Sequence, residues 1–245
     1  MSDVKSTEIE IALASGEALP ALHVEAAGEP RGAIVVAGDI GGARREFIDL
    51  IALELGRTGY DALVPEFFFR EGPLAEMSKE AVIERRGMLD DLRVLADLSA
   101  SIDWLRGQPR FSGARVGTIG FCLGGTFVLN LAAMREDLAT VCYYGFPAET
   151  PVPAGVQGPY PRDEVGKLSG PLLAFWGDQD QRAGQENIAA YIAAAKSREI
   201  EFEAIVYPGL DHAFLMTEWD EGSDGHEPAM DSWRRSLAFF GDELG

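Results

Sequence analysis

The sequence predicts an α/β fold in which a mostly parallel central sheet carries helices on both faces. Short β-type apolar runs alternate with segments whose apolar residues recur at helical spacing, and this alternation is typical of parallel strands joined by crossover helices. The side chains that stand out chemically come just after predicted strands. Ligands bind at that edge of an open parallel sheet, so we expect the functional site there.

Eight strands are predicted from apolar runs. In the first two runs, apolar residues alternate or cluster on either side of a turn at Gly16, which indicates an antiparallel hairpin. The later runs are continuously apolar and indicate buried strands. In chain order the predicted strands cover residues 9–14, 19–25, 32–37, 60–65, 116–119, 140–144, 171–176 and 202–207.

Helices are predicted where apolar residues recur every three or four positions. The longest begins at about Ser78 and ends at Gln108, because the residue before a proline is biased away from the helical conformation. The other helical patterns cover residues 47–55, 127–133 and 185–196, and a C-terminal segment that has Met230, Trp233, Leu237 and Phe240 on one face. The proline-rich segment 146–161 is predicted to be a loop over the ligand edge of the sheet.

Length and composition indicate one α/β domain over residues 1–245. The length also allows two small domains, but 47% hydrophobic residues and 9% aromatic residues can furnish one large core. Two cysteines are too few for a disulfide scaffold, and the first residues lack the apolar stretch of a secretory signal. We therefore expect a cytoplasmic protein.

The charge balance disfavours several classes of partner. With 40 acidic and 21 basic residues, the formal net charge of -19 would repel nucleic acids and anionic membranes. No run approaches the ~20 consecutive apolar residues that cross a bilayer. We expect neither nucleic acid nor membrane as a partner, and the sequence does not indicate an oligomeric state.

Cys122 lies between a predicted strand and a predicted helix, in the run Gly120-Phe121-Cys122-Leu123-Gly124. Small residues two before and two after the central one allow the tight strand-to-helix turn that presents a nucleophile. Cysteine is also a common buried core residue. Cys142 fits that second interpretation better, because its β-type run has no flanking glycines.

A nucleophilic thiol needs a base, and the base needs a group that orients it. His212 follows the predicted strand 202–207 and is the favoured base, whereas His23 lies within an N-terminal strand and His226 before the last helix. The acid should come between nucleophile and base in the chain. Asp180 is preferred to Asp178, although either could cap a turn instead.

Three motifs, GFCLGG, GDQD and YPGLDHAF, occur in this order and resemble those of the dienelactone hydrolases (carboxymethylenebutenolidases). The resemblance covers nearly the whole chain. It implies an α/β-hydrolase fold and a cofactor-free hydrolase that cleaves small esters or lactones through an acyl-thioester at Cys122. In this comparison His212 shuttles the proton, Asp180 orients His212, and the backbone N–H groups of Leu123 and Ile40 bind the oxyanion.

Two departures from the family pattern leave the substrate open. Asp39 stands where the family has a glutamate that holds the resting thiol, although it could instead cap the loop. Met216 stands where the family has an arginine for the substrate carboxylate. A second family arginine lies in the helix before the elbow, where Arg85 or Arg86 could take its place, but a solvated helix residue is the favoured interpretation of each. Met216 itself and four aromatic residues are further candidates for the pocket wall, although aromatic residues near a site are often simply core. The four are Trp176, Phe67, Phe68 and Trp219. An anionic lactone and a less anionic ester both fit.

Other functions are weaker interpretations of the same residues. A redox-sensitive or non-catalytic thiol protein would also use an exposed Cys122. The glycines around it contain no G-x-G-x-x-G, so nucleotide binding is disfavoured. Three scattered histidines without paired cysteines do not predict a metal site.

Overall fold

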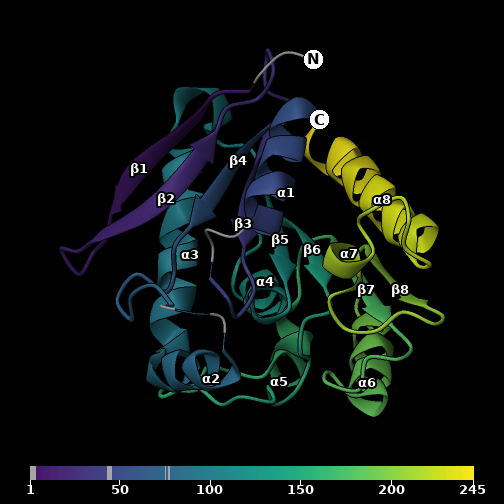
Figure 1. Cartoon of the computed structure of the whole chain (residues 1–245). Helices are drawn as coiled ribbons and strands as arrows, with labels where there is room; N and C mark the ends of the chain where they lie inside the picture. The colour runs from purple at the N-terminus through teal and green to yellow at the C-terminus, as the bar shows by residue number, and fades with distance from the viewer. Residues whose placement is uncertain (1–3, 43–45, 75, 77) are drawn as a thin grey trace.

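The computed structural model describes residues 4–42, 46–74, 76 and 78–245. Its strands form one sheet in the order β1-β2-β4-β3-β5-β6-β7-β8 (Figure 1). The strands are β1 (Ser6–Ala12), β2 (Ala18–Val24), β3 (Gly32–Ala37), β4 (Tyr60–Pro65), β5 (Val116–Phe121), β6 (Leu138–Tyr143), β7 (Leu172–Gly177) and β8 (Phe202–Tyr207). β1 and β2 join through antiparallel pairing, and the other six strands pair in parallel. The mostly parallel sheet and its antiparallel entry hairpin are thus confirmed.

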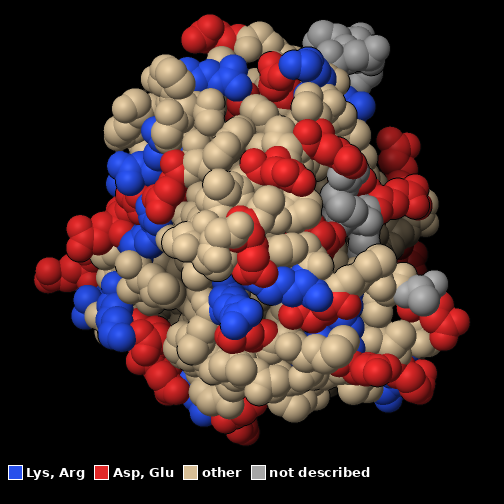
Figure 2. Space-filling view, turned by 90° about the vertical axis from the view of Figure 1, so that its left-hand side faces the viewer, with Lys and Arg blue, Asp and Glu red and all other residues tan. Residues whose placement is uncertain are grey.

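Helices cover both faces of the sheet, with α1 and α8 on one face and α3 and α4 on the other (Figure 1). The helices are α1 (Glu46–Arg57), α2 (Lys79–Met88), α3 (Asp91–Arg106), α4 (Leu123–Met134), α5 (Pro161–Glu164), α6 (Gln185–Lys196), α7 (Phe214–Thr217) and α8 (His226–Leu244), and short 3-10 turns cover Pro109–Phe111 and Val165–Lys167. None of the helices in the described ranges is long and apolar enough to cross a membrane. On the face seen in Figure 2, acidic and basic side chains are interspersed.

The predicted long helix over residues 78–108 is wrong, because the chain forms two helices there. Leu89 has an extended backbone (φ -68°, ψ 140°) and ends α2. Asp90 then caps α3, since its Oδ1 accepts the N–H groups of Leu92 (3.0 Å) and Arg93 (3.2 Å). Met88 and Leu92 seemed in sequence to continue one apolar stripe, but their side chains are exposed. The buried stripe of α3 begins at Val94.

A polar cluster lies within the core beneath the N-terminal hairpin. The carboxylate of Asp61 on β4 is fully buried and contacts His23 Nε2 on β2 at 2.9 Å. It also accepts the N–H of Ala26 at 3.0 Å and a hydrogen bond from Arg110. Burial opposes ionisation of Asp61, but its hydrogen bonds to His23 and Ala26 and the charge of Arg110 lower its pKa overall. A buried carboxylate with this many donors depends on all of them.

Close backbone packing joins β3 to the start of α4. A Cβ added to Gly124 would lie 2.2 Å from the carbonyl oxygen of Ala37 and 2.3 Å from that of Gly38. Those distances are far inside van der Waals contact, and both neighbours are backbone atoms that have no rotamer to change. Gly124 therefore allows the loop after β3 to lie directly against the turn at Cys122.

We expect Asp61→Asn to lower the free energy of unfolding by about 3 kcal/mol, because the substitution leaves the donors around it without their charged partner. The folded-state pKa of Asp61 is below its ordinary value of 3.8, so its stabilisation is present above that pH and is lost as pH falls through the folded pKa. Urea denaturation should thus show a difference that shrinks in acid. The matched control is Asp103→Asn, since Asp103 is largely exposed and should cost less than about 1 kcal/mol. Equal losses in the two variants would contradict the prediction.

We expect Gly124→Ala to lower the free energy of unfolding by about 3 kcal/mol or more, because its Cβ would overlap two carbonyl oxygens. Thermal or urea denaturation measures the loss. Gly166→Ala is the control, because a Cβ at Gly166 meets nothing within 4 Å. A Gly124→Ala protein as stable as the control would show that the backbone can yield here.

Candidate active site

Cys122 occupies a strained turn between β5 and α4. Its φ of 55° and ψ of -113° are rare for a residue other than glycine. Backbone hydrogen bonds hold it there, since its N–H donates to the Tyr143 carbonyl (3.0 Å) and its own carbonyl accepts the N–H of Thr126 (3.1 Å). The side chain is half-buried, whereas Cys142 is fully buried in β6. The turn has the conformation of a nucleophile elbow.

His212 and Asp180 meet at the carboxyl edge of the sheet. His212 lies in the loop after β8, Asp180 in the loop after β7, and His212 Nδ1 is 2.8 Å from Asp180 Oδ2. The other oxygen of Asp180 accepts the N–H groups of Arg182 and Ala183, each at 3.0 Å. Asp180 is fully buried and therefore holds the imidazole in one orientation.

Asp178, the other acid considered from sequence, makes different contacts. Its Oδ1 accepts the N–H of Gly209 at 2.7 Å and the side-chain amide of Gln179 at 2.8 Å. The first of these bonds ties the loop after β7 to the loop after β8. Asp178 thus braces the two loops that carry Asp180 and His212.

The electrostatic surroundings of His212 favour its protonated form. Burial alone would lower its pKa, but the hydrogen bond with Asp180 and the nearby Cys122 thiol outweigh burial and raise the pKa from 6.5 to about 9. Its Nε2 atom is buried and has no hydrogen-bond partner among the described residues. A protonated imidazole beside a thiol is the arrangement that supports a thiolate nucleophile.

Aromatic rings fix the position of the imidazole. The ring of Phe146 stacks on His212 with centroids 5.2 Å apart and an interplanar angle of 28°. The ring of Tyr144 lies at the same centroid distance on a tilted plane. The N–H of Phe146 donates to Thr126 Oγ1 (2.9 Å) on α4. This bond links the residue that stacks on His212 to the helix that follows Cys122. From sequence patterns alone, Phe146 is identified only as the start of the proline-rich loop.

Cys122 and His212 both line a cavity of about 550 Å³. Its wall is formed by Ile40, Ser78, Lys79, Val82, Ile83, Arg86, Cys122, Leu123, Phe146, Thr150, Pro151, Val152, Arg182 and His212. Residues 150–152 come from the proline-rich loop and residues 78–86 from α2 and its N-cap, so these two segments cover the carboxyl edge of the sheet. Lys79 and Arg182 were not singled out from sequence, because their proximity to the cavity depends on how α2 and the loop after β7 fold.

Ile40 and Leu123, the expected oxyanion donors, both line this cavity. Asp39, next to Ile40, accepts the N–H of Gly41 on its Oδ1 at 2.6 Å. Tyr144 is completely buried, and burial together with the nearby charges of Asp39 and Cys122 holds the pKa of its hydroxyl well above 10. Asp39 and Cys122 are thus close enough to the same tyrosine for both to influence it.

The other expected substrate contacts divide into one that reaches the cavity and three that lie elsewhere. Arg86 lines the cavity and forms a forked ion pair with Asp91, one arm of which measures 3.1 Å. Arg85 does not line the cavity, and its Nη2 donates to the Ile40 carbonyl oxygen at 3.1 Å. Trp176 is buried in the core, where its Nε1–H donates to the Gly145 carbonyl at 2.8 Å. Met216 lies on α7 and lines a separate hollow with Phe47 and Trp219, so it faces away from the thiol.

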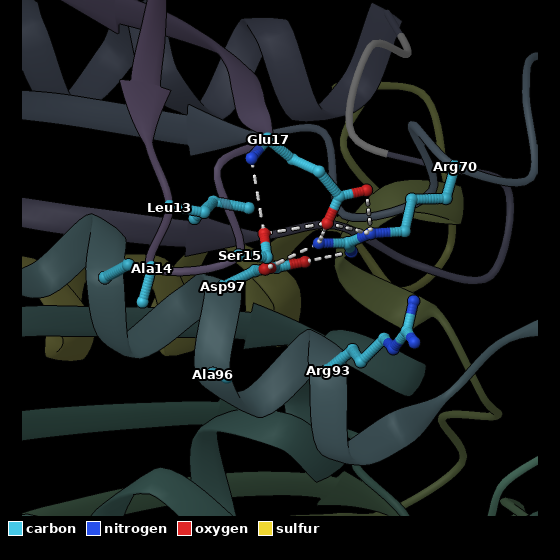
Figure 3. A pocket seen from close by; sticks show the side chains of 9 residues that line it. Leu13, Ala14, Ser15, Glu17, Arg70, Arg93, Ala96 and Asp97 are labelled. Atoms are coloured by element: carbon cyan, nitrogen blue, oxygen red, sulfur yellow. Dashed lines mark hydrogen bonds and ion pairs between the residues drawn. The ribbon is translucent and has the colours of Figure 1, made fainter.

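A second cavity, of about 400 Å³, lies between the β1–β2 turn and α3 (Figure 3). Arg70 points between Glu17 and Asp97 and donates to both carboxylates, for example Nε to Glu17 Oε1 at 3.0 Å and Nη1 to Asp97 Oδ2 at 2.6 Å. The two carboxylates therefore satisfy the charge of the Arg70 guanidinium. The arrangement clamps the hairpin to α3.

Comparison with known proteins agrees with this geometry. The model of the dienelactone hydrolase family matches residues 19–244. The carboxymethylenebutenolidase of Rhodococcus opacus is 30% identical over 225 residues, which cover 91% of this chain and 85% of that protein. A probable 2-oxo-3-(5-oxofuran-2-ylidene)propanoate lactonase of Bradyrhizobium is 26% identical over 195 residues, or 79% of this chain and 77% of that protein.

A solved structure gives the same result. The crystal structure of a putative dienelactone hydrolase from Klebsiella pneumoniae superposes with a TM-score of 0.83 and 28% identity, covering 98% of this chain and 99% of that one. The α/β-hydrolase fold expected from the three motifs is therefore confirmed. The family match, the fold and the relatives together show that this chain belongs to the dienelactone hydrolase family and is a hydrolase of carboxylic esters or lactones.

Proposed function

We propose that this enzyme cleaves a small ester or lactone through an acyl-thioester on Cys122, with His212 and Asp180 completing a Cys-His-Asp triad. One observation carries the proposal. The 2.8 Å contact between His212 Nδ1 and Asp180 Oδ2 leaves Nε2 without a partner beside the cavity that contains the strained Cys122. An oriented base next to a nucleophile on an elbow is the arrangement that acyl transfer requires.

In the first half of the proposed reaction, the Cys122 thiolate attacks the carbonyl carbon and forms a C–S bond. The carbonyl π electrons move to oxygen, and the N–H groups of Leu123 and Ile40 donate to that oxyanion. When the intermediate collapses, the C–O bond to the leaving group breaks. The leaving oxygen takes the proton from His212 Nε2, and the acyl-thioester remains.

In the second half, water attacks the thioester carbonyl while the now neutral His212 Nε2 accepts a proton from it. The second oxyanion binds to the same two N–H groups. Its collapse breaks the C–S bond, releases the carboxylic acid and restores the Cys122 thiolate beside a protonated His212. Asp180 keeps its charge throughout and stabilises the imidazolium at both stages.

The cavity supports a substrate that has an apolar body and a negative charge. Val82, Ile83 and Val152 give the wall an apolar side, while Lys79 and Arg182 contribute exposed cations. These cations matter because the chain as a whole carries a net charge of -19. Arg86 adds a third cation, but its charge is already balanced by Asp91. A lactone or ester bearing a carboxylate is the substrate class we propose to test first, with neutral esters as the comparison.

We expect Cys122→Ala and His212→Ala each to lower kcat/KM for a chromogenic ester by about 10⁴-fold or more, because members of a triad act as a unit. Mass spectrometry of the quenched wild-type enzyme should find the acyl group on the peptide that contains Cys122. The matched controls are Cys142→Ala and His226→Ala, which should stay within about threefold of wild type, since neither residue lines the cavity. Undiminished turnover in either triad variant would contradict the mechanism, and thiol labelling without any turnover would favour the redox interpretation.

We expect kcat/KM to fall on the alkaline side with a midpoint near pH 9. His212 must be protonated to release the leaving group, and its pKa is raised to about 9. In Asp180→Asn the negative partner that raises this pKa is gone, so the alkaline limb should move to lower pH and the rate should fall. A pH profile measured with an ester whose leaving group needs protonation tests both statements. A rate that still rises above pH 10, or a limb that Asp180→Asn leaves in place, would contradict them.

A further inference from the structure

We infer that Arg85 is a positioning residue that holds the Ile40 side of the oxyanion hole from behind. The inference rests on the proposed function, because it concerns how the Ile40 N–H is aimed at the oxyanion. It gives Arg85 a role other than substrate binding, since Arg85 contacts the loop backbone while its neighbour Arg86 lines the cavity.

The loop that carries Ile40 is tightly turned. Asp39 Oδ1 accepts the N–H of Gly41 at 2.6 Å, and the Asp39 carbonyl accepts the N–H of Gly42 at 3.0 Å. Gly42 has a φ of 104°, which favours glycine. On the inner side, the start of the loop lies directly on Gly124 of α4. The Ile40 carbonyl takes no part in these contacts and instead accepts a side-chain hydrogen bond.

Arg85 binds that carbonyl from a fixed position. Its Nη2 donates to the Ile40 oxygen at 3.1 Å and its Nη1 to the Gly72 oxygen at 3.3 Å. Its Cζ lies 4.0 Å from the centre of the Phe68 ring, and the residue is only 5% exposed. A guanidinium with two carbonyl acceptors and an aromatic ring beneath it keeps its orientation, because the planar fork is rigid.

Fixing the Ile40 carbonyl also restricts the Ile40 N–H, since the two groups lie on peptide units that share one Cα. An oxyanion donor lowers the barrier only if it already points to where the charge develops. A misplacement of about 1 Å can cost about 100-fold in rate. Arg85 therefore affects the transition state through the loop, without touching the substrate.

The same contact couples substrate binding to this donor. Lys79, Val82, Ile83 and Arg86 on α2 line the cavity, while Arg85 on the same helix binds the Ile40 loop. A substrate that settles against α2 thus contacts the element that aims the oxyanion hole. Because Arg85 itself contacts the loop and does not line the cavity, its loss should change kcat more than KM.

The experiment compares Arg85→Met and Arg85→Lys with wild type in three measurements. The first is ester hydrolysis, where Arg85→Met should lower kcat by about 10-fold to 100-fold and change KM by less than about threefold. The second is the affinity of an aryl trifluoromethyl ketone, whose carbonyl carbon adds the Cys122 thiolate and whose oxygen becomes an oxyanion. That affinity should fall by the same factor as kcat. The third is alkylation of Cys122 by iodoacetamide, which forms no oxyanion and should keep its rate.

Arg85→Lys should give intermediate losses, because an ammonium can reach one carbonyl but lacks the planar fork. The control is Arg93→Met on α3, where the arginine side chain is 64% exposed, and it should match wild type in all three measurements. Melting temperatures of all variants show whether they are folded at the assay temperature. If Arg85→Met unfolds, the lysine variant carries the test.

The inference is overturned if kcat and ketone affinity are unchanged, or if alkylation falls in parallel with them, since a parallel loss would mean that the whole site is disturbed. Failure of the proposed function would look different. In that case wild type itself would hydrolyse none of the esters, while the comparison of ketone affinity with alkylation rate would still test Arg85.

Discussion

The architecture of the site depends on backbone packing around Cys122. A residue other than glycine keeps a φ of 55° only where the surrounding structure holds its backbone in that conformation. Here they are largely main chain: a Cβ on Gly120 would lie 2.3 Å from the Gly124 oxygen, and one on Gly125 2.7 Å from the Tyr143 oxygen. The contacts bring β3, β5 and β6 to one point. The thiol, the Ile40 loop and the residues beside His212 are placed by that convergence.

A second constraint is that the proposed triad comes from three separate strands. Cys122, Asp180 and His212 follow β5, β7 and β8, so their relative positions are set by the register of parallel pairing rather than by local sequence. Hydrogen bonds between the loops preserve this register at the site. Asp178 ties the loop after β7 to Gly209 after β8, and Thr126 ties α4 to Phe146. The bonds lie outside the reacting groups, yet they determine the distances among them.

Sequence patterns predicted the sheet well because each buried strand is encoded by a short run of adjacent apolar residues. The bounds of β3, β4, β8 and α6 match those predicted from apolar runs and helical spacing. The elbow was also visible, since its glycines lie within five residues of one another. The break between α2 and α3 was not, because apolar Met88 and Leu92 mimic a continuous buried stripe although both are exposed.

The division of roles between Arg85 and Arg86 could not be predicted for a related reason. Adjacent helical residues point about 100° apart, so one can line the cavity while the other binds the Ile40 loop, but which does so depends on how α2 lies on the fold. Met216 and Trp176 fail as pocket residues for the same reason, since α7 turns the first toward another hollow and β7 turns the second into the core. Tertiary placement, rather than residue type, decides the walls of the cavity.

The interruption at Leu89 and Asp90 has an evolutionary consequence. It separates α2, which forms part of the cavity wall, from α3, which packs on the sheet (Figure 1). Only the ion pair between Arg86 and Asp91, at the junction itself, has to be kept for the two helices to stay joined there. Arg85 and Arg86 anchor α2 through groups that do not depend on its remaining side chains. Residues such as Val82 and Ile83 can then be exchanged without disturbing the elbow or the core. A family with this construction can acquire new substrates by changing one short helix while its chemistry is inherited intact.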